Sequence, residues 1–198
     1  MKKSANNVHP IHPILHERWS PRAFSDKPVP SSTLHSLLEA ARWSASCYNE
    51  QPWAFIVATR EQSELYDKVL SSLIEFNRGW AKTAPVLMLA FAHDAFDRNQ
   101  KPNAHAQYDL GACMAQLTAE ATSHGLYVHQ MAGIESDHIR SAFAIPDDWR
   151  PMTGVAIGYL GDPAQLSDDL QKREMEERTR KPLGSFVFGT QWGEASSI

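Results

Sequence analysis

The strongest constraint on the fold is an unbroken apolar run from Ala84 to Ala92. This run is too short to span a bilayer as a helix. A short, continuously apolar segment is typical of a strand that is buried on both faces of a sheet, so we predict such a strand at residues 85–92. A second apolar run, Ala54–Thr59, is rich in β-forming residues and predicts another buried strand.

Apolar spacing and turn residues place the remaining elements. Helical spacing from Leu34 to Ala41 predicts a helix ending near Trp43, and Ser31 or Ser32 can serve as its N-cap. Residues 61–76 are expected to form one helix whose buried side consists of Leu65, Val69, Leu73 and Phe76. Further helices are predicted at residues 11–15, 104–123 and 136–143, and further strands at residues 126–131 and 152–160.

This order of helices and short apolar strands favours an α+β or α/β sandwich whose sheet is covered by helices on both faces. The chain has 198 residues, of which 42% are hydrophobic and 21% charged, and this composition fits one globular domain. We assign residues 11–198 to that domain and expect residues 1–10 to form a flexible N-terminus.

Charge and targeting signals exclude several functional classes. The net charge of -4 argues against a general nucleic-acid-binding protein, which needs a basic face. No apolar run of signal-peptide type follows the basic start of the chain, and the longest apolar run is too short to span a membrane as a helix. The two cysteines, Cys47 and Cys113, lie in unrelated contexts and do not suggest a disulfide framework. A reducing, cytoplasmic setting is therefore the simplest expectation.

The tail from about residue 182 to residue 198 carries Phe186, Phe188 and Trp192, yet little of the predicted core remains to cover them. Exposed aromatic groups of this kind mark interaction surfaces. We therefore expect this tail to be a C-terminal arm that packs on a partner subunit.

A polar loop, Ser44–Trp53, separates the helix that ends near Trp43 from the strand at residues 54–59. A plain connection at this point would need few hydrogen-bonding groups. This one offers Ser46, Asn49 and Gln51 together with a thiol and two aromatic rings. We interpret it as a loop that holds a polar, flat ligand on a rigid scaffold.

Two other segments offer cations to an anionic ligand. Arg18, Ser20 and Arg22 place two guanidinium forks beside a hydroxyl group, an arrangement that suits a phosphate. Taken alone, this motif favours a solvated surface turn. Arg178 and Arg180 lie in a charged stretch that is mostly a solvated face. Combined with the polar loop, these arginines leave open a second interpretation, a phosphate-bearing aromatic cofactor.

Four short motifs follow one another along the chain. Arg-x-Ser-x-Arg-x-Phe occupies residues 18–24, and Ser-x-Ser-x-x-Asn-x-Gln-Pro-Trp occupies residues 44–53. Ile-Gly-Tyr follows at residues 157–159, and Arg-Lys-Pro-Leu at residues 180–183. In this order and spacing, the motifs resemble those of the FMN-dependent nitroreductase family, and the resemblance covers about residues 11–185.

The resemblance implies an α+β fold, a three-layer sandwich in which helices flank a mixed, mostly antiparallel central sheet. It also implies a homodimer that binds FMN at the subunit interface, with each site drawing residues from both chains. The C-terminal arm would then pack on the partner subunit.

The resemblance also implies which residues contact FMN. Those expected at its phosphate, ribityl chain and pyrimidine edge are Arg18, Trp19, Ser20 and Arg22, with Arg178 and Arg180 gripping the phosphate. Those expected to line the ring from the neighbouring subunit are Ala45, Ser46, Cys47 and Asn49. The segment expected beside the ring is Gln130, Met131, Ala132 and Gly133, with the Gly133 amide donating to the flavin N5.

Two positions depart from the family's pattern. Ala45-Ser46-Cys47 stands where the family usually has Pro-Ser-Ser, and Ala132 stands where some members have Glu. The first departure bears on the pyrimidine contact, and the second on what reaches the N5 side of the ring. Both weaken any transfer of substrate preference, but FMN binding remains the expectation.

The activity implied by the resemblance is that of an NAD(P)H-dependent flavin oxidoreductase. In a ping-pong cycle, NAD(P)H passes hydride to the flavin N5, and a nitroaromatic, quinone-like or other small oxidised substrate then takes the electrons. Arg22 and the Gly133 amide would give electrostatic support, and no catalytic side chain is required. The alternatives are a non-catalytic flavin- or nucleotide-binding module, and a flavin-consuming or dehalogenating relative on the same fold.

Two other candidate sites are less favoured. A single unpaired cysteine in a ligand loop, as at Cys47, is more often a packing residue than a reactive thiol. His9, His12 and His16 lie in the N-terminal segment without a nearby set of carboxylates, so we expect no metal site there.

Overall fold

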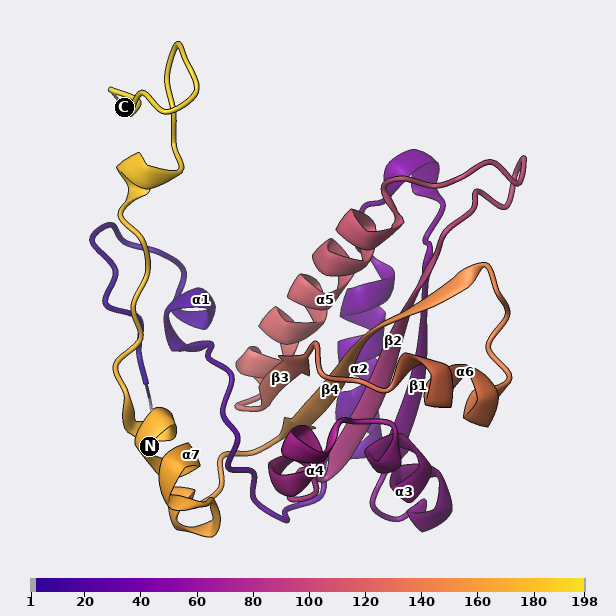
Figure 1. The fold of residues 1–198 in the computed structure, drawn as a ribbon. Coiled ribbons are helices and arrows are strands. Elements are labelled where there is room, and N and C mark those ends of the chain that lie inside the picture. The colour runs from indigo at the N-terminus through magenta and orange to yellow at the C-terminus, as the bar shows by residue number, and fades with distance from the viewer. Residues whose placement is uncertain (1–2, 198) are drawn as a thin grey trace.

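The computed structural model describes residues 3–197, so residues 1, 2 and 198 of the predicted N-terminus and C-terminal arm lie outside the described residues. A four-stranded sheet has the order β1-β2-β4-β3 (Figure 1). Its strands are β1 (Trp53–Thr59), β2 (Val86–His93), β3 (Tyr127–Met131) and β4 (Trp149–Gly158). All three strand pairs are antiparallel, and no parallel pair occurs among the described residues.

Strand β2 lies between β1 and β4, and all eight of its residues are buried. Because side chains alternate along a strand, Leu87 and Leu89 enter the apolar cluster on one face of the sheet. Met88 and Ala90 enter the cluster on the other face. The prediction of a strand buried on both faces is confirmed. The pairing of β2 with β4 has one irregularity in register, between Ala90 and Phe91.

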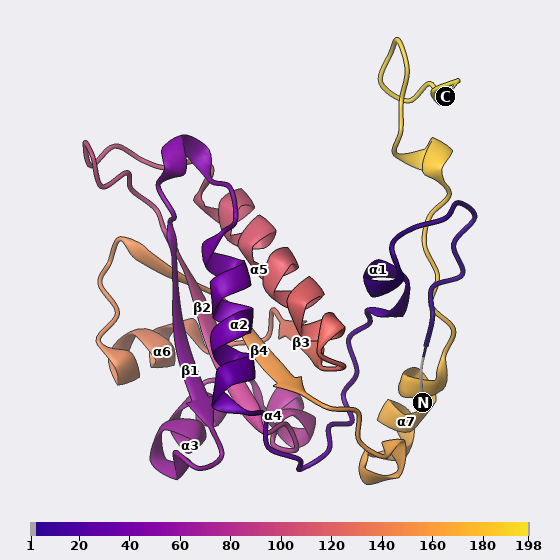
Figure 2. The same cartoon turned by 180° about the vertical axis from the view of Figure 1, so that it is seen from behind.

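Helices cover both faces of the sheet (Figures 1 and 2). Helices α2 (Ser31–Arg42) and α5 (Ala106–Ser123) pack on one face. Helices α3 (Ser63–Ser71), α4 (Glu75–Ala81) and α6 (Ser136–Phe143) pack on the other. The α+β three-layer sandwich is therefore confirmed. No helix within residues 3–197 combines the length and the hydropathy that crossing a membrane requires.

The two ends of the chain run along one flank of the molecule, where they form what we call the arm (residues 3–18 and 168–197). The described residues of the predicted C-terminal arm are the last part of it. It contains α1 (Pro13–Glu17), α7 (Asp168–Met175) and the short η3 (Leu183–Ser185), and η2 (Pro163–Gln165) leads into it. Its two halves are tied together, since the Lys3 ammonium donates to the Glu174 carbonyl (2.6 Å) and Arg178 donates to the Lys3 carbonyl (2.8 Å). Flexibility of residues 1–10 and docking of the tail on a partner remain predictions.

The single helix expected at residues 61–76 is wrong, because the chain forms α3 and α4 with a break between them. At the break, the Ile74 amide donates to the Gly133 carbonyl (3.2 Å), and Leu73 forms an isolated β-bridge with Ile134. Main-chain pairing with the segment after β3 thus replaces the helical hydrogen bonds. As a result Phe76, expected on the buried side, is 52% exposed.

The N-cap expected at Ser31 or Ser32 is also wrong. Both residues already belong to α2, and the N-cap position is taken by Pro30, which makes no side-chain cap hydrogen bond. Proline has no side-chain acceptor, but its fixed φ (here -57°) directs the chain into the helix.

Because β2 forms the centre of both apolar clusters, we expect Leu89→Ala to lower the free energy of unfolding by about 2 to 5 kcal/mol. Leu89 is 1% exposed, so the deletion leaves a cavity that its neighbours cannot fill. Denaturant unfolding at one fixed protein concentration measures the change. The control is Val8→Ala, at a side chain that is 92% exposed, where the change should stay within about 0.5 kcal/mol. Equal losses in the two variants would contradict the assignment of Leu89 to the core.

Candidate functional site

Three arginines from opposite ends of the sequence lie close together in the structure. Arg18 follows α1, and Arg178 and Arg180 follow α7. Burial lowers the pKa of the Arg18 guanidinium, and the charge of Arg180 lowers it further. The pKa of Arg178 is lowered by burial first, and then by Arg18 and Arg180. Within residues 3–197 no carboxylate forms an ion pair with these three groups, so no acid of the described chain neutralises their charge.

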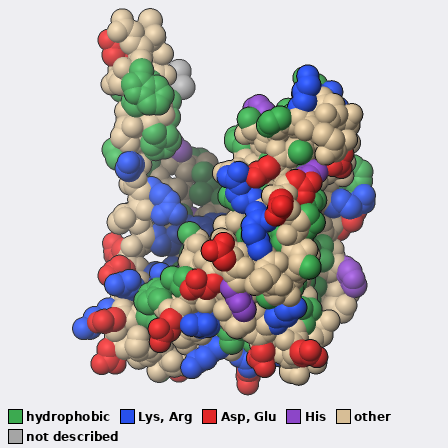
Figure 3. Space-filling view, turned by 45° about the vertical axis from the view of Figure 1, so that its right-hand side comes forward, with side chains coloured by type: hydrophobic (Ala, Val, Ile, Leu, Met, Phe, Trp, Pro, Cys, Tyr) green, Lys and Arg blue, Asp and Glu red, His purple; other side chains and the backbone are tan. Residues whose placement is uncertain are grey.

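The three guanidinium groups differ in the number of hydrogen bonds that they make within the described chain. Arg178 donates to the main-chain carbonyls of Lys3 (2.8 Å) and His16 (3.0 Å) and so ties the arm together. Arg18 makes one long contact with the Ser20 hydroxyl (3.4 Å), and Arg180 donates to the carbonyl of its neighbour Thr179. Arg18 and Arg180 therefore hold most of the unused donors. Figure 3 shows a hollow between the arm and the body of the molecule, with Lys and Arg side chains inside it.

The segment after Arg18 is held against strand β3. The Nδ1 hydrogen of His129 is donated to the Pro21 carbonyl, with 2.8 Å between the heavy atoms. Burial lowers the pKa of His129 to about 4, while the hydrogen bond to Pro21 opposes this shift and the charge of Arg22 adds to it. The imidazole is therefore neutral at pH 7. Trp19 is buried and packs edge-on against Tyr127, with ring centroids 6.0 Å apart.

Arg22 has a buried Nε that no group within residues 3–197 accepts from. A buried donor without a partner is costly, so it points to an acceptor that the chain itself does not supply. The main chain at this point is fixed from α7, since one carboxyl oxygen of Glu174 accepts the amides of Arg22 (2.8 Å) and Ala23 (3.1 Å). The sequence did not single out Glu174, because it is one of several acids in a charged stretch.

Gly133 lies where the chain leaves β3, in a place with no room for a side chain. A Cβ at this position would lie 2.5 Å from Ile74 Cδ1 and 2.6 Å from Asn77 Nδ2. The Gly133 carbonyl accepts from the Ile74 amide (3.2 Å) and from the Asn77 side chain (3.0 Å). Its own amide donates no hydrogen bond to any described residue. The contacts with Ile74 and Asn77 thus hold Gly133 in place while its amide stays unpaired within the described chain. Of the residues before it, Met131 is buried, whereas Gln130 and Ala132 are exposed.

The polar loop contains η1 (Cys47–Asn49) and has an uncommon backbone. Tyr48, Asn49 and Gln51 have φ values of 56°, 57° and 55°, in the left-handed region that non-glycine residues seldom adopt. Each such residue costs roughly 1 kcal/mol or more. Among the hydrogen bonds that hold the loop, the Gln51 amide donates to the Ser46 hydroxyl (2.9 Å), and the Cys47 amide donates to a carboxyl oxygen of Asp109 (3.0 Å).

Asp109 is a second residue that the sequence analysis missed. It is 3% exposed and lies in the first turn of α5, among apolar neighbours. A buried acid within an apolar helical pattern needs a partner, and this was the available signal. Next to the loop, the guanidinium of Arg98 lies 3.9 Å from the ring centre of Tyr48, which is itself 72% exposed.

The chain does not bring all predicted residues together. Figures 1 and 2 show η1 beyond the C-terminal end of α2, away from the arm that carries the arginines. A cavity of about 280 Å³ lies next to Arg178, but the other residues that line it are Lys3, Ser4, Asn6, Met175, Glu176 and Glu177, none of which was predicted to bind FMN. One chain therefore supplies two separate parts of the predicted site, and the assignment of Ala45, Ser46, Cys47 and Asn49 to the neighbouring subunit remains a prediction.

Comparison with known proteins gives consistent results. The model of the Nitroreductase family matches residues 15–159. The solved structure of an oxidoreductase containing FMN is 37% identical and covers 94% of this chain and 95% of its own, with a TM-score of 0.89. A putative NADH dehydrogenase/NAD(P)H nitroreductase of Stenotrophomonas maltophilia is 30% identical over 80% of this chain and 88% of its own length. An iodotyrosine deiodinase of Haliscomenobacter hydrossis is 25% identical over 81% of this chain and 83% of its own.

The partly buried His129 predicts how stability depends on pH. Its pKa is about 4 in the folded chain, against an ordinary value of 6.5, so the unfolded chain takes up the proton first as the pH falls. We expect this residue to lower the free energy of unfolding by about 3 kcal/mol as the pH falls through that window, and by no more below it. His129→Asn, whose Nδ2 takes about the place of the imidazole Nδ1 and can still donate to the Pro21 carbonyl, should remove this part of the slope. Denaturant unfolding of both proteins at a series of pH values tests this, and identical slopes would refute it.

Proposed function

The chain belongs to the nitroreductase family, and from this premise we propose that it is an FMN-dependent oxidoreductase that acts as a homodimer. The observation that carries the proposal is the cluster of Arg18, Arg178 and Arg180, which lack a carboxylate partner within the described residues. A phosphate monoester supplies the charge and the acceptors that this cluster lacks. The FMN-containing structure that is 37% identical supports the same cofactor.

The residues present fit FMN at three points. The unused donors of Arg18 and Arg180 suit a phosphate. The orphaned Nε of Arg22 suits a carbonyl or ring nitrogen on the polar edge of the flavin. The unpaired amide of Gly133 suits a ring nitrogen acceptor. In a homodimer, the strained loop with Ser46 and Asn49 would line the ring from the partner.

When bound, FMN supplies the hydride-accepting and electron-donating chemistry, here with NAD(P)H as donor and a nitroaromatic, quinone-like or other small oxidised acceptor in a ping-pong cycle. The chain's own groups bind and orient. Arg22 brings a fixed positive charge to the place where negative charge develops on reduction, and the Gly133 amide brings a fixed dipole. No acid, base or nucleophile among the side chains is needed. We place the protein in the cytoplasm, where its two unpaired cysteines would stay reduced.

A second candidate function is reductive dehalogenation, supported by the similarity to an iodotyrosine deiodinase. It uses the same cofactor site and differs only in the acceptor. A third, a flavin-binding module without turnover, shares the site but predicts an unreactive bound flavin. The acceptor therefore distinguishes the first two, and reaction with the reduced nicotinamide distinguishes both from the third.

The purified protein tests the proposal directly. We expect a yellow protein, or an apoprotein that takes up added FMN, with the absorption spectrum of a bound flavin. Anaerobic mixing with NADH and with NADPH should bleach that absorption, and a nitroaromatic, a quinone or an iodotyrosine should restore it. A protein that neither contains nor binds FMN would refute the proposal, and a bound flavin that no nicotinamide bleaches would support the non-catalytic binder.

Replacing Arg18 by Ala removes a charge-assisted phosphate contact worth about 1.5 to 3 kcal/mol. FMN affinity should therefore fall about ten- to a hundredfold, as measured by fluorescence quenching on titration of the apoprotein. The matched control is Arg173→Ala, which removes the same charge from the exposed face of α7 and should leave the affinity within about threefold. Equal effects in the two variants would mean that only the overall charge matters.

A further inference from the structure

The side chain of Glu174 links the two halves of the arginine cluster. It lies on α7, and its residue is 3% exposed. Its Oε1 accepts the amide of Arg22 at 2.8 Å and that of Ala23 at 3.1 Å, two main-chain groups some 150 residues earlier in the sequence. The helix that bears it leads directly to Arg178 and Arg180. One carboxyl oxygen therefore ties α7 directly to the segment that carries Arg18 and Arg22.

The choice of partners is informative. A buried acid ordinarily pairs with a guanidinium or ammonium group. Glu174 instead uses Oε1 for two amides, and no hydrogen bond within residues 3–197 reaches its Oε2. A carboxyl group that bound the arginines would compete with an anionic ligand for their donors. Glu174 binds the main chain and takes up no guanidinium donor.

The same turn is held from its other side by His129, which donates to the Pro21 carbonyl. Residues 21–23 are thus bonded to β3 on one side and to α7 on the other. The Arg22 side chain starts from this fixed backbone, and its buried Nε has no partner in the described chain. A shift of the backbone at Arg22 would move that unpaired donor.

We propose that Glu174 is a positioning residue of the FMN site, which acts by holding the Arg22 and Ala23 amides on one carboxyl oxygen. The inference rests on the proposed function. According to this proposal, the position of the side-chain oxygen that accepts the two amides is essential, and the charge of the side chain is not. A glutamine keeps an oxygen at that place and loses the charge, whereas an aspartate keeps the charge and draws the oxygen back by one methylene group.

The experiment compares the wild-type protein with Glu174→Gln, Glu174→Asp and Glu174→Ala. We expect FMN affinity within about threefold of wild type for the Gln variant, and at least about tenfold weaker for the Asp and Ala variants. At saturating FMN, the midpoint potential of the bound flavin should be more negative in the Asp variant than in the wild type, which carries the same charge, because a displaced Arg22 no longer favours the reduced, anionic form. A role in stability alone would leave that potential unchanged.

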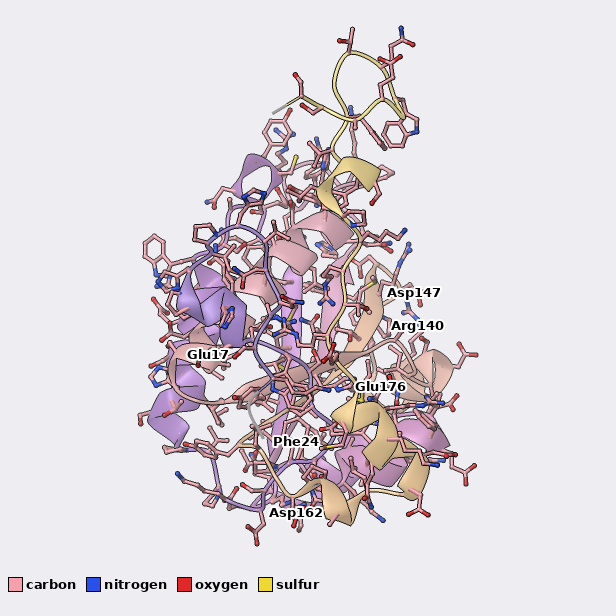
Figure 4. All side chains as sticks on the ribbon, turned by 90° about the vertical axis from the view of Figure 1, so that its left-hand side faces the viewer. Glu17, Phe24, Arg140, Asp147, Asp162 and Glu176 are labelled. Atoms are coloured by element: carbon pink, nitrogen blue, oxygen red, sulfur yellow. The ribbon has the colours of Figure 1, made fainter. Side chains whose placement is uncertain are left out.

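The control is Glu176→Ala, at an exposed acid labelled in Figure 4 at the end of the same helix. It removes an equal charge without touching an amide of residues 22–23, and FMN affinity should stay within about threefold. A wild-type protein that binds no FMN refutes the proposed function, and the proposal for Glu174 with it. If the wild type binds FMN, the proposal for Glu174 alone is overturned when the Gln variant is weakened as much as the Asp variant, or when neither the Asp nor the Ala variant is weakened. If the Ala variant does not fold, the comparison of Gln with Asp decides.

Discussion

The arm contains three guanidinium groups that lie close together although their positive charges repel one another. The charge of Arg180 lowers the pKa of Arg18, and the charges of Arg18 and Arg180 lower the pKa of Arg178. The donors of Arg178 are bound by neutral main-chain carbonyls rather than by acids. The two carbonyl bonds of Arg178 and the two amide bonds of Glu174 keep both ends of the chain in place. The cluster keeps its net charge for this reason, and it is this charge that an anionic ligand would meet.

The sheet gives this arrangement a rigid support. Strand β2 is buried along its whole length and anchors both layers of helices, and β4 and β3 extend the sheet toward the arm. On one face, α4 closes over Gly133, and on the other, α5 holds the polar loop through Asp109. Gly133 and the polar loop therefore sit on elements whose positions are set by core packing, whereas the three arginines sit on the arm.

The strands and most helices could be predicted from the sequence, because continuous apolar runs and helical spacing report burial directly. The break between α3 and α4 could not, since it comes from main-chain pairing of Leu73 and Ile74 with residues far ahead in the sequence. The motifs around Arg22 and Asn49 were visible as unusual local clusters. Glu174 was not, because it lies among other acids and its main-chain partners are distant in the sequence. The burial of Asp109 was indicated by its place in an apolar helical pattern, but its partner in the polar loop was not.

The left-handed residues of the polar loop also affect how much ordering a ligand must impose. Tyr48, Asn49 and Gln51 already have the backbone that the loop requires, held by Ser46 and Asp109. The conformational entropy of this segment is thus lost when the protein folds and not when a ligand arrives. A preorganised loop gives a stronger and faster association than a flexible loop with the same side chains. Glycines would relieve the strain at these positions, but the more flexible loop would then lose conformational entropy when the ligand binds.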